Sequence, residues 1–142
     1  MPLADTLLRL AHGTVLYEPF WSSQIIAEVN RTLSIKFGLS SASIEARERN
    51  MRRHVLAAAV EAQAEIVVTY NLRDFEPESL SPYNIKAMGP SSFLRILYER
   101  NPKAVLRTLH EQAESIREST GFVLDRLEVN VPAFIASLRT QL

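Results

Sequence analysis

The chain has 142 residues, the size of one domain with a small appendage, and its 46% hydrophobic content supports a packed core. Its 16 basic residues balance its 16 acidic residues, so the net charge gives no argument for a nucleic-acid or membrane partner. There is no cysteine, no apolar run near the ~18 residues of a transmembrane helix and no secretory-signal pattern at the start, so we expect a cytoplasmic protein without disulfides or thiolate chemistry.

The N-terminal part of the chain alternates predicted helices with short predicted strands. Leucines spaced along one helical face predict a helix near residues 3–11 that ends at Gly13, and residues 14–17 are a strand candidate. A second helix is predicted over 22–37, and a third over 40–64, whose first part is charged and whose second part is rich in alanine.

The strongest strand signal lies at residues 66–70, where the run IVVTY is continuous and rich in β-branched side chains. Residues 84–88 are predicted as a second, parallel strand. A loop over 71–75 leaves the carboxyl end of the first strand. Because chemistry in parallel sheets gathers outside the carboxyl ends of strands, Asp74 in this loop is the leading candidate for a functional residue.

The C-terminal part is predicted to be helical throughout. A helix is predicted over about 91–98, the next begins at Asn101 with proline after the cap, and one or two helices follow over 122–142. The alternation before this part predicts an α/β fold, with a parallel sheet flanked by helices. We therefore predict an α/β domain over residues 1–100 and a helical extension over 101–142.

Four segments carry more specific sequence: WSSQIIAEV at 21–29, RHVLAAA at 53–59, IVVTYNLRDF at 66–75 and PYNI at 82–85. Together with the helices predicted after Asn101, these segments resemble the PIN-domain family. In particular, they resemble a bacterial subgroup with a C-terminal helical extension, near the VapC-type toxins of toxin–antitoxin pairs. The resemblance covers nearly the whole chain.

This resemblance implies a metal-dependent endoribonuclease site. PIN domains gather three or four carboxylates around Mg²⁺ or Mn²⁺, hard cations that prefer oxygen ligands, and the metal activates water against the phosphate. By resemblance, Glu28 and Asp74 are the catalytic and metal-binding residues, and Asn71 is a further metal ligand. Arg53 and His54 would contact single-stranded RNA. An antitoxin-like protein and a second copy of the chain are the implied protein partners.

The chain also departs from the family pattern. Residues 2–8 resemble the helix that follows the family's first strand, so we expect that central strand and its aspartate to be missing. Arg52 stands where the family carries its third acid, and Arg49 stands where a further aspartate often lies. With two carboxylates left, we predict weak or absent metal binding and weak or absent hydrolysis.

Each candidate residue also has a structural interpretation. Glu28 would be a solvated helix charge, and the polar residues of the 71–74 loop would form a turn after the strand. The basic residues over 47–54 would lie on an exposed helix face with internal ion pairs such as Glu48–Arg52.

Two alternatives for the whole chain stay open at this point. The first is a degenerate PIN fold that serves as a non-enzymatic interaction module, binding a partner protein or a second copy. The second is an unrelated α/β domain, in which Glu28 and Asp74 would lie far apart.

Overall fold

A computed structural model describes residues 2–14, 16–20 and 41–141. The chain forms two compact units, each considered by itself. The helical unit comprises Met1–Pro19 and Gly89–Leu142, and the sheet unit comprises Phe20–Met88. The predicted division into an α/β domain over 1–100 and a helical extension over 101–142 stays a prediction.

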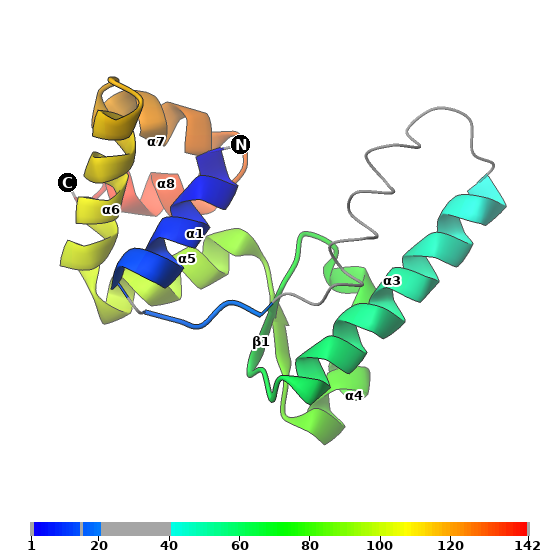
Figure 1. Cartoon of the computed structure of the whole chain (residues 1–142). Helices are drawn as coiled ribbons and strands as arrows, with labels where there is room; N and C mark the ends of the chain where they lie inside the picture. The colour runs from blue at the N-terminus through cyan, green and yellow to red at the C-terminus, as the bar shows by residue number, and fades with distance from the viewer. Residues whose placement is uncertain (1, 15, 21–40, 142) are drawn as a thin grey trace. The chain divides into compact units, whose positions relative to one another are not determined.

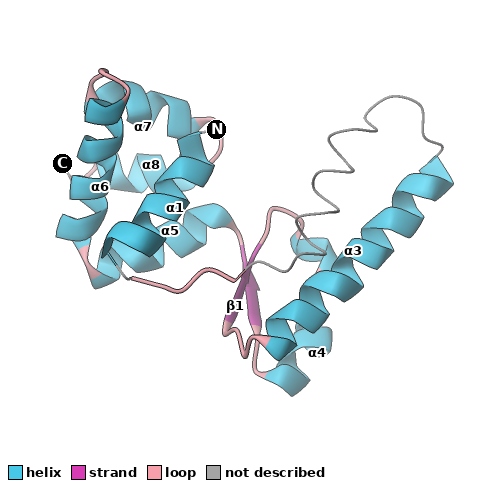
Figure 2. Ribbon diagram, viewed as in Figure 1, coloured by secondary structure: helices cyan, strands magenta, loops and turns pink. Residues whose placement is uncertain are grey.

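The sheet unit contains a parallel two-stranded sheet, β1 (Ile66–Val68) beside β2 (Lys86–Met88), which confirms the predicted α/β class (Figure 2). Val67 pairs with Ala87 at the centre of the ladder. The β1 strand follows α3 (Ser41–Glu61), whose second half carries the apolar residues that pack on the sheet.

A small apolar core joins α3 to β1 and to the short helix α4 (Pro77–Leu80). Its buried members are Ala59, Val67, Leu80 and Ile85. Phe75 packs against this cluster from the loop after β1, so that loop is held by the core on one side. Between α4 and β2 lies a single 3-10 turn, η2 (Ser81–Tyr83).

The helical unit is built from α1 together with the helices of the C-terminal part of the chain (Figure 1). Its helices are α1 (Pro2–Thr14), α5 (Pro90–Arg100), α6 (Pro102–Ser115), α7 (Thr120–Glu128) and α8 (Pro132–Arg139). The α1 helix packs against α6 and α7 although these helices are far away in sequence. Residues 2–8 are therefore helical, as the resemblance implies. Among the described helices, none is long and apolar enough to cross a membrane.

One expected strand is wrong. Of residues 14–17, Thr14 belongs to α1 and Tyr17 lies in a segment without secondary structure. The Tyr17 ring packs edge-on against Phe93 with 5.0 Å between the ring centroids, and its hydroxyl donates to the Leu7 carbonyl oxygen at 2.6 Å. Contacts within the helical unit thus override the local strand preference. The helix predicted over 22–37 lies outside the described residues.

The predicted start of α6 is confirmed in its details. The side-chain oxygen of Asn101 accepts a hydrogen bond from the Ala104 backbone N–H at 3.0 Å, and Pro102 occupies the first helical position.

Asn101→Ala removes this cap, and we expect the free energy of unfolding to fall by about 1 kcal/mol. Urea unfolding followed by circular dichroism measures the loss. Asn101→Asp, which keeps an accepting oxygen, is the matched control and should stay near wild type. Equal losses in the two variants would contradict the capping role.

Candidate functional site

The loop after β1 turns back sharply and places Asp74 beside the end of the strand. The Thr69 backbone N–H still bonds to the Met88 carbonyl at 3.0 Å, which extends the ladder one residue past β1. The Thr69 hydroxyl oxygen then accepts from the Asn71 backbone N–H at 3.1 Å. A 3-10 turn, η1 (Leu72–Asp74), follows, and within it the Asp74 backbone N–H donates to the Asn71 carbonyl at 3.2 Å.

Both carboxylate oxygens of Asp74 have close partners. The Asn71 side-chain N–H donates to Oδ2 at 2.5 Å, and Arg52 Nη1 lies 3.3 Å from Oδ1. The Asp74 side chain is only 18% exposed, so water screens this pair less than it screens an ion pair on an open surface. The structure therefore brings Asp74 and Asn71 together, with the amide group of Asn71 facing the carboxylate as a donor.

Arg52 comes from the middle of α3 and is held in place by packing as well as by charge. Its side chain is 36% exposed, yet Nε is buried and has no hydrogen-bond partner in the part of the chain that the structure describes. A buried donor without a partner costs about 1–3 kcal/mol. The Arg52 side chain thus reaches Asp74 while its Nε–H goes without the hydrogen bond that it would make to water.

The predicted RNA contacts lie next to this ion pair in the sequence. Arg53 and His54 follow Arg52 on α3, and both side chains are exposed. Glu28 lies outside the described residues, so its place relative to Asp74 stays a prediction.

The described residues around Asp74 offer few ligands for Mg²⁺ or Mn²⁺, and Glu28, the other proposed ligand, lies outside them. The described residues contain no group of three or more carboxylate or imidazole side chains that could hold a metal ion. Near Asp74 there is also a fixed positive charge. At ~5 Å and an effective dielectric constant of about 20, two unit charges interact by about 3 kcal/mol, and a divalent ion doubles this value, so Arg52 repels such a cation strongly.

Arg52 is the residue of this site that the pattern did not reveal. The sequence marks it only as a residue that stands where the family carries an acid, and the sequence pattern does not predict its contact with Asp74. The available signal was the change of charge at that position: a cation at a place expected to hold an anion is suited to pair with a remaining carboxylate.

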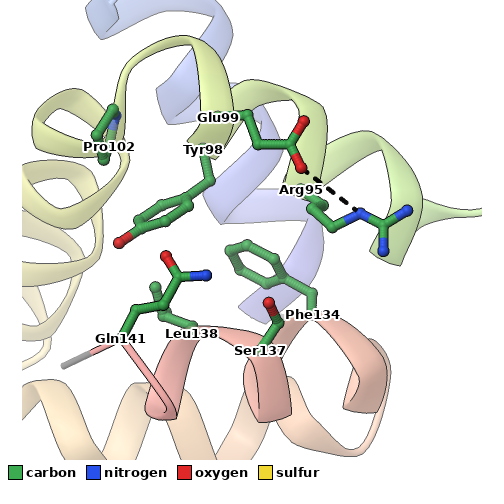
Figure 3. A pocket seen from close by; sticks show the side chains of 8 residues that line it. All are labelled: Arg95, Tyr98, Glu99, Pro102, Phe134, Ser137, Leu138 and Gln141. Atoms are coloured by element: carbon green, nitrogen blue, oxygen red, sulfur yellow. Dashed lines mark ion pairs between the residues drawn. The ribbon is translucent and has the colours of Figure 1, made fainter.

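A separate cavity of about 260 Å³ lies in the helical unit between α5 and α8 (Figure 3). Its wall includes Tyr98 and Phe134, whose rings meet edge-on with 6.4 Å between their centroids. At its rim, Arg95 Nε and Glu99 Oε1 lie 3.9 Å apart, so these two charges face each other. The rest of the lining mixes apolar and polar side chains, among them Leu138, Ser137 and Gln141.

The chain is similar over nearly its whole length to a protein of Mycobacterium tuberculosis (strain ATCC 25618 / H37Rv) described as "Putative ribonuclease VapC50". The two are 35% identical over 150 aligned residues, which cover 98% of this chain and 89% of the other. No protein-family model and no solved structure matches the chain.

Proposed function

This chain belongs to the PIN-domain family of VapC-type toxins, and from that membership we propose that it is an endoribonuclease-related protein whose metal-dependent cleavage of single-stranded RNA is impaired. One observation carries the second half of this proposal. The carboxylate at the end of β1 is engaged by the chain's own Arg52 and Asn71. A carboxylate that is already paired on both oxygens is a poor ligand for a further cation.

The residues proposed for what remains of the nuclease site are those expected from the sequence. Glu28 and Asp74 are the proposed catalytic and metal-binding carboxylates, with the Asn71 amide as an auxiliary ligand. Two carboxylates with a guanidinium beside one of them would hold Mg²⁺ or Mn²⁺ weakly at best.

Arg53 and His54 are proposed to contact RNA. Both are exposed on α3, and arginine side chains are frequent partners of phosphate oxygens. Because such contacts depend on charge and not on a bound metal, the chain would keep RNA binding even where cleavage is weak. An RNA substrate would place this activity in the cytoplasm, and an antitoxin-like protein or a second copy of the chain is the proposed protein partner.

The test is an RNA cleavage assay with the full chain, single-stranded RNA and Mn²⁺. We expect slow or undetectable cleavage by the wild type, and Asp74→Ala should lower any residual rate further because it removes one of the two proposed metal-binding carboxylates. Circular dichroism of both proteins controls for folding. Robust Mn²⁺-dependent cleavage by the wild type that disappears in Asp74→Ala would overturn the proposal.

The same ion pair also supports a second candidate function, a non-enzymatic interaction module. In that case a partner protein binds the PIN fold while the nuclease site is unused. Complete absence of cleavage, together with equal partner binding by wild type and Asp74→Ala, would favour this function over an impaired nuclease.

A further inference from the structure

The guanidinium of Arg52 lies against the carboxylate of Asp74, where a nuclease of this family would need a metal ion's charge. We call the space around the Asp74 carboxylate, next to Arg52 and Asn71, the Asp74 corner. We infer that the guanidinium of Arg52 occupies this corner as a built-in cation and excludes divalent ions. The Arg52 side chain would then decide whether the corner binds a metal ion. The inference rests on the proposed function, and it names Arg52 as the cause of the impaired metal-dependent cleavage.

The geometry supports a specific pairing. Arg52 Nη1 lies 3.3 Å from Oδ1, and the Asn71 amide covers Oδ2, so the two partners divide the carboxylate between them. Both contacts belong to the sheet unit. A bound cation would have to displace the guanidinium from Oδ1 and would still lie beside its positive charge.

The burial of Arg52 separates this arrangement from an ordinary surface ion pair. Long basic side chains on surfaces usually keep their polar atoms hydrated. Here Nε is buried without a hydrogen-bond partner among the described residues, while the Asp74 side chain is largely covered. Part of the guanidinium is therefore shielded from water where it faces Asp74, although the Arg52 side chain as a whole is 36% exposed.

The inference predicts a gain of function from one substitution. Arg52→Glu replaces the cation by a carboxylate on a shorter side chain. The space left by the guanidinium would then lie between two carboxylates, with the Asn71 amide oxygen available after rotation of the amide. Oxygen ligands of this kind suit Mn²⁺, whereas the wild-type corner has one carboxylate and a positive charge.

Mn²⁺ alone is the probe, and isothermal titration calorimetry on the full chain is the measurement. We expect Arg52→Glu to bind one Mn²⁺ per chain at least tenfold more tightly than the wild type. Arg53→Glu is the matched control because it makes the same change of charge one residue away at an exposed position, and it should stay near the wild type. Adding Asp74→Asn to Arg52→Glu should abolish the gain.

The inference is overturned if folded Arg52→Glu binds Mn²⁺ no more tightly than Arg53→Glu, or if the wild type binds Mn²⁺ as tightly as Arg52→Glu. Circular dichroism establishes folding. If Arg52→Glu does not fold, Arg52→Gln replaces it: severalfold tighter binding than wild type supports the inference, and unchanged binding overturns it. Weak wild-type RNA cleavage without a gain of Mn²⁺ binding would leave the proposed function standing and remove Arg52 as its cause.

Discussion

Replacing Leu10 by alanine is expected to lower the free energy of unfolding of the helical unit by about 2–5 kcal/mol. Leu10 is completely buried on α1, which packs against α6 and α7. The cavity that Leu10→Ala creates should stay open because a polar contact also fixes α1. The buried Thr6 hydroxyl lies 2.7 Å from Oε1 of the buried Gln112 on α6. With α1 held in this way, its neighbours relax only partly into the space that the leucine leaves.

Leu8→Ala is the matched control for this prediction. It makes the same substitution two residues earlier on the same helix, but the Leu8 side chain is 41% exposed. Its effect on helix propensity is the same, so the difference between the two variants isolates the burial. Urea unfolding followed by circular dichroism gives both values. If both variants lost the same stability, α1 would not be an integral part of the helical unit.

The elements that were predicted correctly are those whose signals are local. The start of α6 needs only Asn101 and Pro102, whose cap and ring conformation act within one helical turn. The parallel pairing of β1 with β2 follows from an apolar run at β1 and a second short strand segment, separated by a connection long enough to cross over. At Tyr17 the local sequence favours a strand, but a residue distant in sequence determines the conformation. The Tyr17 ring packs against Phe93 within the helical unit, and no strand forms there.

The candidate site divides in the same way. Asn71 and Asp74 are three residues apart in one turn, so their contact follows from local loop geometry. Arg52 reaches Asp74 from another element, whereas helix periodicity predicts only partners within α3, such as Glu48, whose side chain lies outside the described part of the chain. Its contact with Asp74 depends on how α3 packs on the sheet, and no residue pattern in either segment encodes that packing.

A second large effect is expected at alkaline pH, through Tyr17. Burial raises the pKa of its hydroxyl to about 12, whereas an unfolded tyrosine titrates near ~10. Between these two values the folded chain keeps the proton and the unfolded chain loses it. Because the unfolded state then binds fewer protons, the free energy of unfolding falls as the pH rises. The contribution is fully present below pH ~10 and is lost as the pH approaches about 12; because Tyr17 is only half-buried and water screens part of the effect, the total loss is roughly 1–2 kcal/mol.

Tyr17→Phe should reverse its rank against the wild type as the pH rises. At pH ~8 the variant lacks the hydrogen bond to the Leu7 carbonyl and should be less stable by about 1 kcal/mol. Above pH ~10 only the wild type loses stability through ionisation at position 17, so the two stability curves should converge and then cross. Urea unfolding at steps between pH 8 and pH ~11.5 measures the curves, and the difference in phenolate absorbance between the proteins follows Tyr17 directly. A constant difference in unfolding free energy over this range would show that the Tyr17 hydroxyl is not shielded from water by the helical unit.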